Sequence, residues 1–145
     1  MPKHHVCIFR PDGELNGRVI ARLVLWLEAI EVDVLRPFDR FTDLTKLVTL
    51  NLTAYDVENL ALWRRTNYSG PVVKSVFLAG SGETNRMAEK YQMLMEGSQI
   101  LVSLFRELED AARWLRVPEE VLRGPKGGGP TGDIAPPSEN GSSDR

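Results

Sequence analysis

The apolar and polar positions form their clearest pattern in residues 72–104, where they predict a strand, a helix and a second strand. Two short apolar runs, VVKSVFLAG and SQILVSL, are bounded by Gly or Pro and are typical of strands buried on both faces of a parallel sheet. Between them, apolar residues recur at helical spacing: Met87, Tyr91, Leu94 and Met95. A helical crossover of this kind joins neighbouring parallel strands, so we expect an α/β fold.

The rest of the chain repeats this alternation of strands and helices. An apolar run at residues 5–9 ends at the turn Pro11-Asp12-Gly13, and residues 38–44 alternate like a strand with one polar row. Helical periods cover residues 18–36, 54–65 and 106–117, with one more turn at 119–122, whereas residues 46–51 are expected to be a connection. We therefore predict a small, mostly parallel or mixed sheet of about four strands with about four helices packed on it.

Composition divides the chain into a domain and a tail. Residues 1–122 have the length and the apolar content of one domain. Residues 123–145, RGPKGGGPTGDIAPPSENGSSDR, are rich in Gly, Pro and Ser and have almost nothing to bury. We predict that they form a disordered tail.

Overall charge and cysteine content narrow the class of protein. The chain is 26% charged with a formal net charge of -2, which gives no electrostatic case for a nucleic-acid partner. The single cysteine, Cys7, lies in an apolar run, where we expect a buried thiol rather than a reactive one. No apolar run near the N-terminus is long enough for a signal peptide or a membrane span, so we expect a cytoplasmic protein without a transmembrane segment.

The first predicted helix carries more apolar residues than one buried face needs. Val19, Leu25 and Trp26 fall outside its main apolar stripe, and an apolar helix of this kind must be covered by something. Three interpretations stay open: burial under a neighbouring helix or the C-terminal tail, an interface with a partner or a second subunit, and a groove for an apolar ligand.

Candidate chemistry is sparse. His4 and His5 are adjacent on a predicted strand and point to opposite faces, so they do not suggest a metal site. The chain has neither a Ser-His nor a Cys-His arrangement for nucleophilic catalysis, and we predict no catalytic residue and no cofactor. The turn Gly80-Ser81-Gly82 before a helix, with Thr84 in its first turn, is either an ordinary tight turn or a weak anion site.

Five stretches carry a resemblance to a known family. They are PDGELNG, PFDRFTDLTKL with a following helix that ends WRR, GPVVKSVFLA, MAEKYQMLMEG and VSLFRELEDAARWL. Together they resemble the SpoIIAA-like branch of the STAS family, the sulfate-transporter and anti-sigma-factor-antagonist fold. The resemblance covers residues 5–122, and its most telling pieces are FTDL at 41–44 and LFRELEDA at 104–111.

The resemblance implies two functions, both non-enzymatic. Anti-sigma-factor antagonists are partner switches in which a Ser or Thr at the start of a helix is phosphorylated. Here Thr53 stands near that place, with Asn51 where the family has an acid, so Thr53 is either a phosphorylation site or an ordinary N-cap. The SpoIIAA-like branch is also likened to small carriers of apolar or lipid-like ligands.

We therefore predict a non-enzymatic module that binds a protein partner or a second copy of itself. The predicted apolar surface comprises Val19, Leu25, Trp26 and Trp63, and its polar rim comprises Asp43, Arg64 and Arg65. One alternative is a carrier in which the same apolar surface encloses a lipid-like or other apolar small molecule. A second alternative is a phospho-regulated switch, with Thr53 or the segment of Ser81, Gly82 and Thr84 as the phosphorylation or anion site.

Overall fold

A computed structural model describes residues 5–33, 37–80 and 82–123 as alternating strands and helices. In chain order the elements are β1 (Val6–Phe9), β2 (Gly13–Asn16), α1 (Gly17–Asp33), β3 (Asp39–Asp43), β4 (Leu47–Asn51), α2 (Ala54–Asn67), β5 (Val73–Leu78), α3 (Gly82–Leu94), β6 (Ile100–Phe105), α4 (Leu108–Leu115) and α5 (Glu119–Arg123). The tail was predicted at 123–145, but its first residue, Arg123, is the last residue of α5. The rest of the predicted tail, 124–145, lies outside the described residues, and so does Ser81. The extra helical turn predicted at 119–122 is confirmed as α5.

The main sheet has four strands in the order β1-β3-β5-β6, and every neighbouring pair is parallel. The predicted strand–helix–strand unit is confirmed as β5, α3 and β6, with Val73 opposite Ile100 at one end and Leu78 opposite Phe105 at the other. Because parallel neighbours need a crossover connection, helices return the chain to the same edge each time. The predicted α/β class and its four-stranded, mostly parallel sheet are confirmed.

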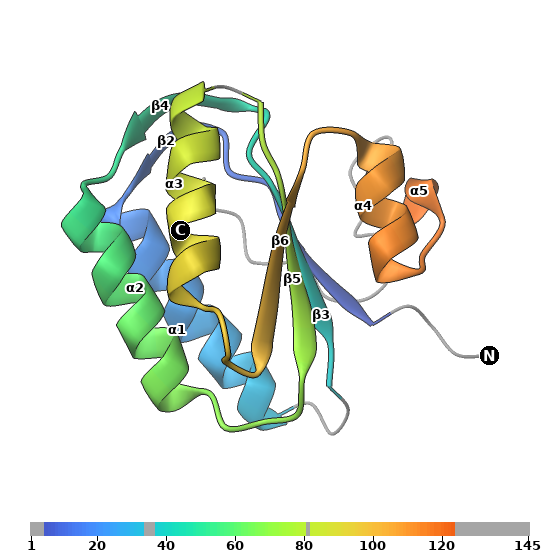
Figure 1. The fold of residues 1–145 in the computed structure, drawn as a ribbon, viewed down its shortest axis with the longest axis horizontal. Helices are drawn as coiled ribbons and strands as arrows, with labels where there is room; N and C mark the ends of the chain where they lie inside the picture. Colours follow the sequence, from blue (N-terminus) through green and yellow to red (C-terminus); the bar gives the residue numbers. More distant parts are fainter. Residues whose placement is uncertain (1–4, 34–36, 81, 124–145) are drawn as a thin grey trace.

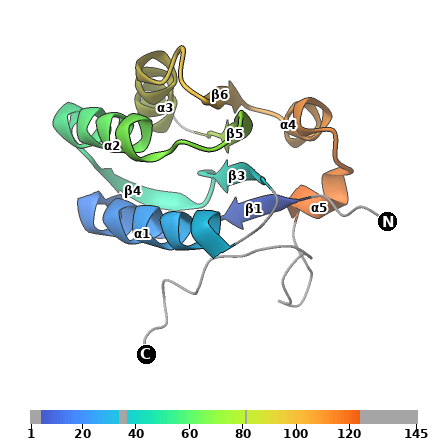
Figure 2. The ribbon, with the colours of Figure 1, turned by 90° about the horizontal axis from the view of Figure 1, so that it is seen from below.

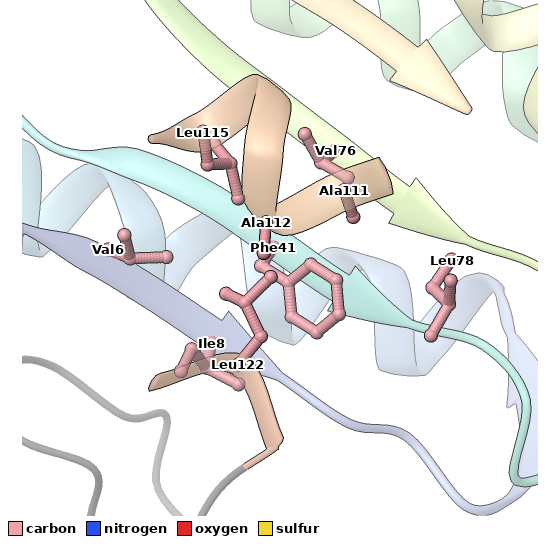
Figure 3. Close-up of a cluster of buried hydrophobic side chains, with 9 residues drawn as sticks. All are labelled: Val6, Ile8, Phe41, Val76, Leu78, Ala111, Ala112, Leu115 and Leu122. Atoms are coloured by element: carbon pink, nitrogen blue, oxygen red, sulfur yellow. The ribbon is translucent and has the colours of Figure 1, made fainter. Parts of the chain in front are cut away.

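Helices cover both faces of the main sheet. Figure 2 shows α1, α2 and α3 on one side of the strands and α4 and α5 on the other. On the α4 and α5 side, Phe41 and Val76 of the sheet meet Ala111, Leu115 and Leu122 of the helices in one buried cluster (Figure 3). Each large apolar side chain fully buried there contributes about 1.5–3 kcal/mol, so this face is the well-packed core of the domain.

The opposite face is covered by the three other helices. Val57 and Ala61 of α2 and Tyr91 of α3 pack with Val73 and Ile100 of the sheet. Phe77 and Tyr91 meet edge to face, with ring centroids 5.8 Å apart. This helical layer contains the site described below.

A second, two-stranded sheet was missed by the sequence analysis. Strands β2 and β4 pair in parallel, although residues 46–51 were expected to be a connection. Each strand leads into a helix, β2 into α1 and β4 into α2, so the pair lies at the N-terminal ends of both helices (Figure 1). Asn16 and Asn51 donate from Nδ2 to the same Oε2 of Glu14, at 3.0 and 3.1 Å, and tie the two strands together.

The polar row of β3 is a second correction. Arg40 and Thr42 were expected on a polar face of the strand, but both side chains are buried beneath the helical layer. The apolar face of β3 carries Phe41 toward α4 and α5. Both faces of this strand are therefore interior, as in other parallel sheets.

The predicted N-cap of α2 is confirmed. Thr53 Oγ1 accepts from the backbone N–H of Asp56 at 3.1 Å, and Asp56 Oδ2 accepts from the backbone N–H of Thr53 at 2.9 Å. This reciprocal pair is a capping box, which satisfies two donors that the first turn of a helix leaves free.

We expect Leu122→Ala to lower the free energy of unfolding by about 2–5 kcal/mol, because it opens a cavity where α5 packs on the sheet. Urea unfolding followed by circular dichroism measures the change. Leu62→Ala, at an exposed position of α2, is the matched control and should cost about 0.5 kcal/mol or less. Equal effects of the two substitutions would show that α5 is not part of the core.

Candidate functional site

An interior pocket of about 110 Å³ lies between the main sheet and the helices α1, α2 and α3. Its walls come from all three helices, from the inner face of the sheet and from the β2–β4 pair. None of the side chains that line it is exposed. The lining of the pocket is therefore buried or half-buried throughout.

The strand pleat and the helical period place these side chains. Alternation along the strands puts Arg40 and Thr42 of β3 and Ser75 and Phe77 of β5 on the helical side. The main stripe of α1, predicted from its spacing, faces the pocket with Ile20, Leu23, Val24 and Leu27. The β2–β4 pair and the segment after it close one end with Leu15, Leu50 and Leu52. Most of the lining is apolar.

Charged side chains gather at the pocket's other end. Arg40 of β3 and Arg64 of α2 both donate from Nη2 to the same oxygen, Oε2 of Glu31 on α1. Arg40 Nη1 also donates to the backbone carbonyl of Phe38 at 2.8 Å. Arg64 Nη1 is buried without a hydrogen-bond partner in the described part of the chain, 3.6 Å from Glu28 Oε2. This Arg40–Glu31–Arg64 cluster links three elements.

Two tyrosines flank the charged cluster. The Tyr68 ring lies 5.3 Å from the guanidinium of Arg40 and 5.7 Å from that of Arg64, close enough for cation–π attraction. Burial raises the pKa of Tyr68, and it raises the pKa of Tyr91, which lines the pocket, to about 12. At neutral pH the Tyr91 hydroxyl therefore keeps its proton and is a hydrogen-bond donor toward its surroundings.

A separate groove of about 350 Å³ runs between α1 and α2. Leu25 and Trp63, two members of the predicted apolar surface, line it and are exposed. Trp63 Nε1 donates to Oε2 of Glu28 at 2.6 Å, which joins the two helices across the groove. Val19 and Trp26 are half-buried and do not line the groove. The structure thus brings together two of the four predicted surface residues.

The predicted polar rim is not assembled at one place. Arg64 is buried in the charged cluster rather than at a rim. Arg65 is exposed and donates to the backbone carbonyls of Leu94 and Glu96, which ties α2 to the end of α3. Asp43, at the far end of β3, accepts from the backbone N–H and the hydroxyl of Thr45. Arg65 and Asp43 thus have structural partners of their own.

The residues proposed for phosphorylation or anion binding are also dispersed. The Thr53 hydroxyl is part of the capping box of α2. Gly82 is the first residue of α3, whereas Thr84 is buried and lines the interior pocket. Ser81 is outside the described residues, so this predicted site stays a prediction.

Arg40 and Glu31 were missed as site residues, although the sequence carries a signal for the cluster. Glu31 continues the apolar stripe of α1 four residues after Leu27, and Arg64 lies seven residues after Val57, on the buried stripe of α2. A charged residue at a stripe position on two helices indicates that the two meet inside the protein, where each needs a partner.

Other kinds of site find little support among the described residues. In residues 5–33, 37–80 and 82–123, no three of the His, Cys, Asp and Glu side chains come together as metal ligands. The same part of the chain contains no helix long and apolar enough to cross a membrane. Cys7 is buried, as predicted, and burial raises the pKa of its thiol to about 12, which leaves little reactive thiolate.

We expect Glu31→Gln to lower the free energy of unfolding by about 3–5 kcal/mol, because it leaves two buried guanidinium groups without their shared counter-charge. Chemical denaturation measures the loss. The control Glu58→Gln breaks an exposed pair with Lys90 and should cost about 1 kcal/mol or less. A cost for Glu31→Gln no larger than that of the control would contradict a structural role for the cluster.

No family model matches the chain, and no curated protein does. Among solved structures, the chain is similar to an uncharacterized protein of the DUF3478 family from Shewanella loihica PV-4, described as having a SpoIIAA-like fold. The two share 18% sequence identity with a TM-score of 0.48, over 74% of this chain and 82% of the other.

Proposed function

We propose that this protein is a carrier of a small apolar molecule, which it holds in the interior pocket. The observation that supports this best is a cavity of about 110 Å³ inside a domain of this size. Protein interiors are normally packed as densely as organic crystals, with few voids larger than a water molecule. A cavity that persists under three helices is better explained by an occupant than by poor packing.

The size and lining of the pocket set the kind of occupant. In another protein, an apolar cavity of about 150 Å³ stays dry and takes up benzene. The pocket described here is of that order but smaller, so we expect an occupant of about six carbon atoms at most. Binding then follows from removal of apolar surface from water, and the carrier performs no chemical step on its ligand.

We expect Ala88→Leu to fill the pocket and abolish ligand uptake. Ala88 is buried on α3 and lines the cavity, so a larger side chain occupies the ligand's place. Native mass spectrometry of protein purified without denaturation should show an adduct for the wild type and none for the variant. Titration calorimetry with 1-hexanol should show affinity reduced by about tenfold or more.

The matched control is Ala29→Leu, the same change at an exposed position of α1 outside the pocket. It should retain both the adduct and the affinity for 1-hexanol. A wild-type protein that carries no adduct and binds neither benzene nor 1-hexanol would overturn the carrier proposal.

A second candidate function is self-association through the groove between α1 and α2. Leu25 and Trp63 expose apolar surface along this groove, and such surface on a domain marks contact sites for other proteins. Trp is also among the residues that contribute most to protein–protein binding. The same groove is the part of the predicted partner surface that the fold brings together.

We expect Leu25→Asp to weaken a dimer by placing a charge in the apolar interface, so that light scattering across a concentration series reports a smaller mass. Leu62→Asp is a close control, because Leu62 is 64% exposed against 63% for Leu25 but does not line the groove. A monomeric mass for the wild type at every concentration would rule out self-association.

A further inference from the structure

Hydrogen-bond donors concentrate at the charged end of the interior pocket. Arg40, Arg64, Ser75 and Tyr91 all line this pocket, and Arg40 and Ser75 are direct cross-strand partners of β3 and β5. The Tyr91 hydroxyl lies within electrostatic reach of both guanidinium groups. The wall opposite the β2–β4 pair is thus polar and rich in donors.

One of these donors, Nη1 of Arg64, is buried without a hydrogen-bond partner in the described part of the chain. The Arg64 side chain is 3% exposed, and Oε2 of Glu28 lies 3.6 Å from this nitrogen, beyond hydrogen-bond distance. A buried polar group without a partner costs about 1–3 kcal/mol, and most such groups in native proteins are satisfied. The missing acceptor points to a group that enters the pocket from outside.

The charges at this end favour an anion. The side chains of Arg40 and Arg64 are only 6% and 3% exposed, and both share the single carboxylate of Glu31. The second carboxylate nearby, Glu28, is 26% exposed and accepts from Trp63, so water screens much of its charge. Glu28 and Glu31 thus balance the two guanidinium groups in formal charge, but the partial exposure of Glu28 leaves Arg64 less strongly compensated than Arg40, and a further anion beside Arg64 Nη1 is stabilised.

We propose that the ligand of the interior pocket is a small monocarboxylic acid, with its carboxylate against Arg64, Ser75 and Tyr91. Its apolar chain then runs toward Leu15 and Leu50 at the β2–β4 end. An ionised carboxylate has only acceptor sites, and the guanidinium and hydroxyl groups of this wall can donate to them. This inference rests on the proposed carrier function and adds the chemical class of the ligand.

The test compares hexanoate with 1-hexanol, which has the same number of carbon atoms and no charge. Titration calorimetry on the full chain should give hexanoate an affinity at least about tenfold higher, since hydrogen bonds to a charged group are the stronger kind. Ser75→Ala and Tyr91→Phe should each lower hexanoate affinity about tenfold or more. Both variants should fold, because each substitution removes a single hydroxyl oxygen and leaves the rest of the side chain in place.

Thr42→Val is the matched control, since it removes a hydroxyl from the same wall but two residues farther along β3 from Arg40. It should leave hexanoate affinity within about twofold of the wild type. The acid proposal is overturned if hexanoate and 1-hexanol bind with equal affinity. It is also overturned if Ser75→Ala and Tyr91→Phe leave hexanoate binding unchanged. In both cases the carrier function stands. Failure of both probes to bind would overturn both.

Discussion

The hydrogen-bonded charge cluster of Arg40, Glu31 and Arg64 determines how the helical layer sits on the sheet. Removing an ion from water costs several kcal/mol, so three buried charges are tolerated only when their geometry is good. Oε2 of Glu31, on α1, accepts one hydrogen bond from Arg40 of β3 and a second from Arg64 of α2. Hydrogen bonds are directional, so these bonds fix the distance of α1 and α2 from the strands. Apolar contacts are not directional and would allow that distance to change. A layer fixed in this way need not collapse onto the pocket beneath it.

The two faces of the sheet therefore differ in kind. On the side of α4 and α5, Phe41, Val76 and Leu122 are almost completely buried and fill the space between strand and helix (Figure 3). On the side of α1, α2 and α3, polar side chains of β3 and β5 line the interior pocket. One face supplies stability through dense packing, and the other supplies room and polar groups. This division places any ligand chemistry away from the part of the core on which folding most depends.

Local patterns predicted the elements that depend on local physics. The strand–helix–strand unit at β5, α3 and β6 and the N-cap at Thr53 follow from spacing and capping preference within a few residues. Strands β2 and β4 were missed because they are four and five residues long and their sequences, GELN and LVTLN, do not alternate between apolar and polar residues. The burial of Arg40 and Arg64 was missed because a charged side chain is normally expected in solvent, and a stripe position such as that of Arg64 indicates burial only together with a partner such as Glu31. The pocket depends on how side chains from five or more elements pack, which no single stretch encodes.

The shared acceptor at Glu14 has a consequence for the two helices that follow it. Helices α1 and α2 run side by side in the same direction, since a Cβ at Gly17 would stand 3.7 Å from Asp56 while Glu31 meets Arg64 at the other end. Their macrodipoles are then parallel, and their positive ends repel each other where both helices begin. Hydrogen bonds from Asn16 and Asn51 hold the pKa of Glu14 below its ordinary value, so a negative charge stays near both ends. At the opposite ends, Arg64 and Arg65 lie in the last turn of α2, and Arg64 bridges to Glu31 of α1. The two positive poles thus share the charge of Glu14, and the negative pole of α2 has arginines of its own.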